Sequence, residues 1–111
     1  MNKTLLDLHD MLLARHTDLS QTLDGVTDPA TAKAIIMEMQ ELLHRIDLAQ
    51  NLLFRQSSQQ LEATLPGITK ANDALAKSIQ SIDDVGAFLT ATANFLKYAD
   101  EAIDIAKSLA A

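Results

Sequence analysis

Apolar residues recur at alternating spacings of four and three from Leu61 to Ile103. This heptad pattern is typical of a long helix that packs lengthwise against another helix. Thirteen positions make up the pattern, and ten of them are apolar. Two earlier stretches, residues 3–24 and residues 29–54, also carry apolar stripes at helical spacing, and the second stripe is the wider one. The pattern therefore predicts an all-α protein.

Helix boundaries follow from residues that start or stop helices. Asn2 is a suitable N-cap for a first helix over about residues 3–24, and Gly25 supplies a left-handed residue that ends it. Asp28 and Pro29 start a second helix, which we expect to continue through the polar run 55–60 to about residue 63. Pro66 and Gly67 then predict a tight turn before a third helix over about residues 68–109.

These three long helices predict a single helical domain over residues 1–111, an antiparallel bundle with a coiled-coil-like hairpin around Pro66-Gly67. The third helix carries one apolar stripe up to Ile82 and a second stripe beyond it. We therefore expect three helices to pack together near the termini, with a two-helix stalk over roughly residues 51–82. The alternative is a four-helix bundle with a break near Asp83, because Ser81-Ile82-Asp83-Asp84 resembles a capping box and Gly86 follows it.

A two-helix stalk would leave apolar side chains in water, so its heptad positions become the candidate interface. Two such stalks could form a four-helix bundle, which predicts a homodimer. A polar residue at position 72 of this stripe would set the register or the number of partners. The candidate interface residues are Leu61, Leu65, Ile68, Asn72, Leu75, Ile79 and Ile82.

Charge and composition restrict the partner. Nine Lys or Arg residues stand against fifteen Asp or Glu residues, giving a net charge of −6 with no basic cluster. Neutralisation of phosphate groups dominates nucleic-acid affinity, so we expect no nucleic-acid partner. No uncharged apolar run approaches the length of a membrane span, and the absence of Cys suits a reducing compartment. The expected protein is cytoplasmic, with no membrane partner.

Candidate chemistry is sparse. Glu41 and His44 have the Glu-x-x-His spacing of helical metal sites, and Asp100 or Asp104 could add ligands, but a second copy of the motif is missing. The competing interpretation is a surface Glu and a boundary His. His9 and His16 are two helical turns apart, too far for one metal ion. We expect no catalytic residues, no metal and no cofactor, since neither a nucleophile elbow nor a phosphate-binding loop is present.

The sequence therefore predicts a non-enzymatic protein that binds a specific, basic protein partner through helix packing. Chaperone-like, immunity-like and adaptor-like proteins share this build, although the analogy concerns shape alone. A metal- or ligand-binding bundle that uses Glu41 and His44 is the first alternative. A structural subunit of a larger assembly is the second alternative.

Overall fold

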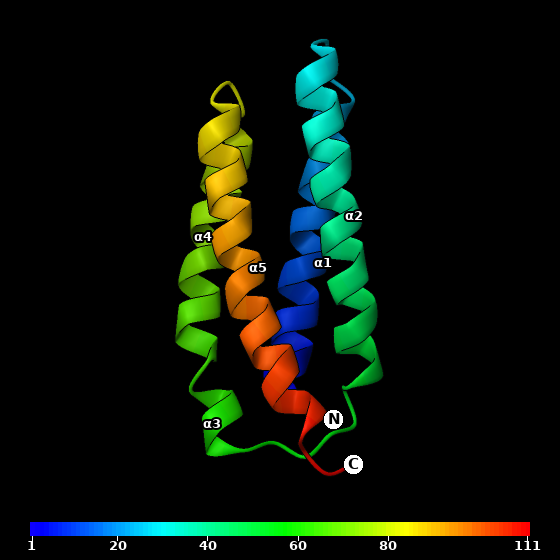
Figure 1. Ribbon diagram of the computed structural model, residues 1–111, viewed down its shortest axis with the longest axis vertical. Coiled ribbons are helices and arrows are strands. Elements are labelled where there is room, and N and C mark those ends of the chain that lie inside the picture. The colour runs from blue at the N-terminus through cyan, green and yellow to red at the C-terminus, as the bar shows by residue number, and fades with distance from the viewer.

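The computed structural model describes all 111 residues, and the chain forms five helices. Four of them are long, namely α1 (Lys3–Leu23), α2 (Pro29–Asn51), α4 (Leu65–Gln80) and α5 (Val85–Lys107), and α3 (Gln59–Glu62) is a single turn. α1 and α2 form one antiparallel hairpin and α4 and α5 form another, and the two stand side by side in an elongated bundle of 46 × 21 × 16 Å (Figure 1). None of the helices has the length and apolar character needed to cross a membrane.

The two hairpins pack so that α1 contacts α4 and α2 contacts α5. α2 and α4 therefore occupy opposite corners of the bundle, and the chain between them crosses its lower end (Figure 1). As a result, α2 and α5 run in the same direction, from the end with the two hairpin loops toward the end with both termini (Figure 1).

The four-helix alternative is confirmed, and the arrangement of three long helices is wrong. The expected third helix is interrupted at residues 81–84, where Ser81 ends α4 and the Asp84 carboxylate accepts a hydrogen bond from Ala87 N–H at 2.9 Å. The expected second helix ends at Asn51 instead of residue 63. The polar run 55–60 has no apolar face to bury, so it does not continue the helix. Within it, the Ser58 hydroxyl accepts a hydrogen bond from Leu61 N–H and so caps the start of the separate helix α3.

Pro66 and Gly67 do not form the expected turn. Both lie in the first turn of α4, where a proline has no intrahelical hydrogen bond to lose. Gly67 is explained by its neighbour, because a Cβ at this position would lie 2.8 Å from Cε1 of Tyr98 on α5. Glycine here permits close packing of two helices. Gly25 was expected to end the first helix in a left-handed conformation, but no glycine in the protein has a positive φ.

Capping at the starts of α1 and α2 is as predicted. Asn2 Oδ1 accepts a hydrogen bond from Leu5 N–H at 3.1 Å, and Asp28 accepts one from Thr31 N–H at 3.0 Å with Pro29 next to it. Two hydrogen bonds lower the pKa of Asp28: the one from the Thr31 hydroxyl has the larger effect, and the one from the Thr31 N–H has the smaller.

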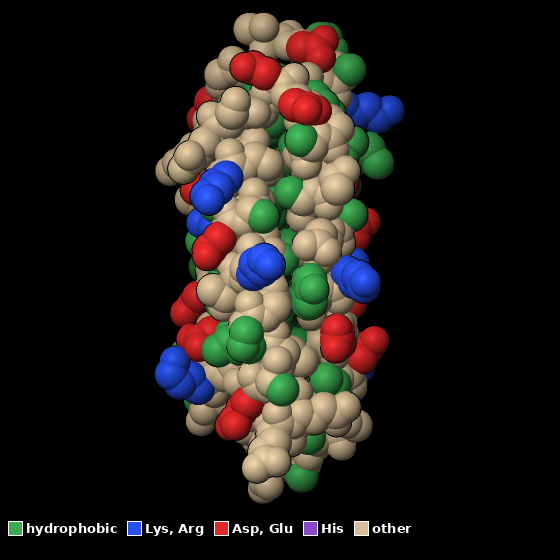
Figure 2. Space-filling model, turned by 90° about the vertical axis from the view of Figure 1, so that its left-hand side faces the viewer, with side chains coloured by type: hydrophobic (Ala, Val, Ile, Leu, Met, Phe, Trp, Pro, Cys, Tyr) green, Lys and Arg blue, Asp and Glu red, His purple; other side chains and the backbone are tan.

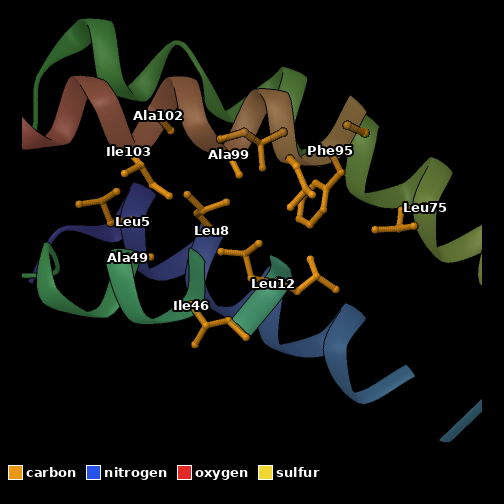
Figure 3. Close-up of a cluster of buried hydrophobic side chains, with 14 of the residues drawn as sticks. Leu5, Leu8, Leu12, Ile46, Ala49, Leu75, Phe95, Ala99, Ala102 and Ile103 are labelled. Atoms are coloured by element: carbon orange, nitrogen blue, oxygen red, sulfur yellow. The ribbon is translucent and has the colours of Figure 1, made fainter. Parts of the chain in front are cut away.

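The core is one continuous cluster of 21 buried hydrophobic residues drawn from both hairpins. Leu8 and Leu12 of α1, Phe95 of α5 and Leu75 of α4 follow one another along the bundle axis (Figure 3). All four of these side chains are fully buried. Burial of such apolar surface is the main force that holds the two hairpins together.

Both ends of the chain hold the crossing segment between α2 and α3 in place. Asn2 N–H donates to the Leu53 carbonyl at 2.7 Å, and Asn2 Nδ2 donates to the Arg55 carbonyl at 3.1 Å. From the other end, the Leu109 carbonyl accepts from the Arg55 guanidinium at 2.6 Å, and the Ala110 carbonyl accepts from Gln56 N–H at 2.7 Å. These bonds satisfy backbone groups that no helix could satisfy.

Candidate protein-binding face

The structure buries the stripe that the sequence suggested as an interface. Four of its seven members lie in the core, and the other three are half-buried. No two-helix stalk exists over residues 51–82, because α1 and α5 cover the inner face of α4. The buried members are Leu61, Ile68, Leu75 and Ile79, and the half-buried ones are Leu65, Asn72 and Ile82.

The outer surface of α4 offers no replacement for that stripe. None of the large hydrophobic side chains exposed on the protein belongs to α4. On the side of the bundle where α4 lies, hydrophobic side chains form small separate areas between acidic and basic ones (Figure 2). Asn72 accepts a hydrogen bond from the Arg15 guanidinium of α1 at 3.2 Å, so this polar position joins the two hairpins within one chain.

Exposed hydrophobic side chains gather around α2 instead. Seven large hydrophobic residues are exposed, and two of them, Met1 and Phe54, lie at the crossing end of the bundle. The other five lie in helices, and each is on α2 or on the flank of a helix beside it. We call these five residues the α2 face: Leu13, Ile36, Met37, Leu43 and Leu89.

One half of the α2 face lies along the contact between α1 and α2. Arg15 of α1 points toward α4, and Leu13, two residues earlier, lies on the opposite flank, next to α2. Leu43 is likewise two residues from Arg45, whose side chain reaches α5, so Leu43 lies on the α1 side of α2. Ile36 is two turns before Leu43 on the same flank.

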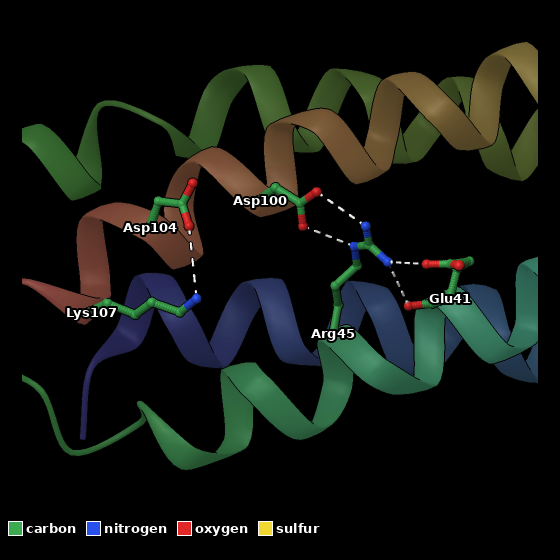
Figure 4. A network of polar contacts seen from close by, with 5 residues as sticks. All are labelled: Glu41, Arg45, Asp100, Asp104 and Lys107. Carbon is green, nitrogen blue, oxygen red and sulfur yellow. Dashed lines mark hydrogen bonds and ion pairs between the residues drawn. The ribbon is translucent and has the colours of Figure 1, made fainter.

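The other half lies along the contact between α2 and α5. Arg45 of α2 binds both carboxylate oxygens of Asp100 on α5, at 2.9 and 3.1 Å, and also the Glu41 carboxylate at 2.6 Å (Figure 4). Leu89 precedes Asp100 by eleven residues, about three turns, so it shares the flank of α5 that faces α2. Met37 is eight residues before Arg45, so it lies on the outer surface of α2 beside this contact, and it is 54% exposed.

Arg45 is the main polar link between α2 and α5. Desolvation lowers the pKa of Arg45, but its hydrogen bonds to Asp100 and then to Glu41 outweigh that effect and leave the pKa raised. A bidentate guanidinium–carboxylate pair also fixes the relative position of the two helices.

Glu38 lies two turns before Arg45, on the side of α2 that faces α5. Its side chain is half-buried and makes no hydrogen bond or ion pair within 4.0 Å. Desolvation, and to a smaller extent the nearby Glu41 carboxylate, raise the pKa of Glu38. The Arg45 guanidinium lowers the pKa of Glu38, but by less than desolvation and Glu41 together raise it, so the half-buried carboxylate is only partly compensated.

The side chains considered for a metal site do not come together. Glu41 and His44 are both exposed, and Glu41 is occupied by Arg45. Asp100 also binds Arg45, whereas Asp104 lies 3.9 Å from Lys107 (Figure 4). No group of three or more His, Asp or Glu side chains has the geometry to hold a metal ion. His9 and His16 are half-buried, and His9 Nδ1 lies 3.3 Å from Asp10.

Reasoning from the sequence missed the α2 face, although two signals for it were present. The apolar stripe of residues 29–54 is wider than a helix with two neighbours needs, and the excess positions, Ile36 and Leu43, are those that remain exposed. Glu38 lies between apolar Ile35 and Met39 on this helix. An acidic residue within such a stripe is a second signal.

Comparison of the chain with protein-family models, with curated proteins and with solved structures finds no match.

Proposed function

We propose that the protein acts without catalysis, by binding a protein partner through helix packing on the α2 face. One observation carries this proposal: all five large hydrophobic side chains that are exposed in helices lie on α2 or beside it. Single exposed hydrophobic residues are common on protein surfaces, but their concentration on one side is characteristic of an interaction surface. Exposed apolar helix surfaces bind amphipathic helices in many protein complexes.

The shape of the bundle also supports this function. Buried core residues line all four long helices, and the Arg45–Asp100 pair holds α2 against α5. The surface is therefore formed before a partner arrives, which reduces the entropy that binding must overcome. The α2 face therefore replaces residues 61–82, which the sequence suggested, as the proposed partner surface.

Photo-crosslinking tests this assignment. A photoreactive amino acid at Gln40, exposed on α2 between the two halves of the α2 face, is compared with one at Thr69, exposed on α4. The expected result is a discrete crosslinked complex from position 40 only, and its yield should fall when Leu43→Ser is added. Equal capture at both positions, or capture that ignores Leu43→Ser, would refute the α2 face as the binding surface.

A further inference from the structure

A hollow at the crossing end of the bundle lies between the start of α1 and the crossing segment. Its volume is about 410 Å³, and it is open to solvent. The residues that line it come from residues 1–4, from residues 54–57 and from α3. The bond from Asn2 N–H to the Leu53 carbonyl, at 2.7 Å, fixes the crossing segment against the start of α1, so the hollow is part of the folded protein.

Two backbone donors at the start of α1 have no partner. The side-chain and backbone oxygens of Asn2 accept hydrogen bonds from Leu5 N–H and Leu6 N–H. The N–H groups of Lys3 and Thr4 make no hydrogen bond. α1 is 21 residues long and has no acidic residue in its first turn, so nothing there neutralises the positive end of its helix dipole. Free N–H groups at such an end attract anions.

Thr4 is an independent sign that the hollow takes a ligand. The residue is only 6% exposed, yet its hydroxyl makes no hydrogen bond within the protein. Arg15 Nε is the only side-chain nitrogen or oxygen that is sealed from solvent without a hydrogen-bond partner, so the Thr4 hydroxyl is still reached from the hollow that Thr4 lines. Side chains in a helix lean toward its N-terminus, which places this hydroxyl on the same side as the two free N–H groups. Buried polar groups normally have partners, and a molecule in the hollow would supply one.

The charges around the hollow favour a ligand with a single negative charge. Lys3 and Arg55 line it, and Arg55 binds the Leu109 carbonyl without a carboxylate partner. Lys3 is shared with the Asp7 carboxylate, 3.1 Å from its Nζ, and Glu62 is the only acidic residue that lines the hollow. The two cations are therefore nearly balanced, and the backbone donors are left to bind one added charge, whereas a doubly charged anion would be repelled more strongly by Glu62.

The hollow also has an apolar part. Met1 and Phe54 are the two hydrophobic residues that line it, and they are the most exposed large hydrophobic side chains of the protein, at 74% and 76%. Apolar walls beside a few convergent polar groups are characteristic of sites for small organic ligands.

We propose that this hollow binds an organic carboxylate. The carboxylate accepts hydrogen bonds from the N–H groups of Lys3 and Thr4 and from the Thr4 hydroxyl, and the apolar group next to it lies against Met1 and Phe54. A free carboxylic acid and the C-terminal residue of a peptide both offer this chemistry. The site shares no residue with the α2 face, so it goes beyond the proposed function, and either can fail without the other.

Heteronuclear NMR spectra of the full chain test the site through the amide signals of Lys3 and Thr4. Hexanoate is the probe for a free acid, and N-acetylleucine is the probe for a peptide end. Hexanamide keeps the apolar chain without the charge, and acetate keeps the charge without most of the chain. We expect at least one probe to shift both amide signals in a saturable way, and hexanamide and acetate to bind about tenfold more weakly than that probe.

Each comparison can overturn a part of the proposal. Absence of a shift at both amides with both probes would overturn the site. Equal binding of hexanamide would overturn the role of the charge, equal binding of acetate that of the apolar wall, and tighter binding of inorganic phosphate the carboxylate class. Tighter binding of hexanoate assigns the site to a free acid, and tighter binding of N-acetylleucine assigns it to a peptide C-terminus.

Thr4→Val removes the hydroxyl at nearly constant shape and should weaken binding of the tighter probe about tenfold, as for a hydrogen bond to a charged group. Thr17→Val is the matched control, because Thr17 is exposed on the same helix, and it should leave binding unchanged. Glu62→Gln removes the carboxylate at the hollow and should strengthen binding about twofold, a gain that a damaged fold could not produce. Equal effects of the two threonine substitutions would overturn the site, and unchanged or weaker binding by Glu62→Gln would overturn the charge argument. Circular dichroism checks that all three variants keep their helices.

Discussion

Truncation of two leucines to alanine distinguishes a core position from a binding position. Leu75 of α4 is fully buried between the hairpins, whereas Leu43 on the α2 face is 48% exposed. Leu75→Ala removes a buried isobutyl group and leaves a cavity, so the free energy of unfolding should fall by about 3–5 kcal/mol. Leu43→Ala removes a side chain of which only about half is buried, so the loss should be about 1 kcal/mol or less.

Urea denaturation followed by circular dichroism measures both effects. A domain of this size has a total stability on the order of 5–15 kcal/mol, so the Leu75 variant should unfold at a clearly lower urea concentration. Binding should show the reverse order, with Leu43→Ala weakening the partner complex while Leu75→Ala, at temperatures where it remains folded, leaves it unchanged. A loss below about 1 kcal/mol for Leu75→Ala would refute the coverage of α4 by α1 and α5.

Three more substitutions test particular polar contacts. Asn2→Ala removes the cap on Leu5 N–H and the bond to the Arg55 carbonyl, and should cost about 2 kcal/mol in urea denaturation; an unchanged midpoint would show that the crossing segment needs no anchor. Asn72→Leu removes an acceptor from Arg15, and calorimetry should show a loss of about 1–2 kcal/mol in stability. Glu38→Gln tests how stability depends on pH. The pKa of Glu38 is raised in the folded state, so just above pH 4.5, the ordinary pKa of a glutamate, the folded protein binds more protons than the unfolded one. The free energy of unfolding of the wild type therefore falls as the pH rises through that range. Thermal melts should therefore show the Gln variant slightly more stable than wild type at neutral pH, with the advantage gone at pH values below 4.5; an advantage that persists in acid would point to a cause other than ionisation.

Local signals in the sequence predicted local structure well. The caps at Asn2 and Asp28 depend on bonds to residues three positions away, and such short-range chemistry can be read without the fold. The apolar periodicity of residues 61–103 also identified the buried side of α4. In α5 it did not, because Leu89 of that pattern is exposed while Phe88 and Phe95 of the second stripe are buried. Periodicity shows that one side of a helix is covered, but it does not show which element covers it.

That limit explains the two main errors. The stripe containing Leu75 and Ile79 was expected to be an interface with another chain, whereas α1 and α5 supply the cover. Gly67 was expected to mark a turn. A glycine is needed there because the Tyr98 ring packs against it, and this contact is not visible from the sequence, where the two residues are 31 positions apart. Contacts between distant residues decide both points, and a single sequence does not reveal them.

The hydrogen bonds on the crossing segment have a consequence for the order in which this bundle can assemble during synthesis. The hairpin of α1 and α2 is contiguous, and the Asn2 bonds to Leu53 and Arg55 are available once the ribosome has released the first half of the chain. The bonds to Leu109 and Ala110 form only after α4 and α5 have been synthesised. The first hairpin, with half of its apolar core side uncovered, therefore has to wait for the second, and Leu109 and Ala110, which follow α5, close the joint between them.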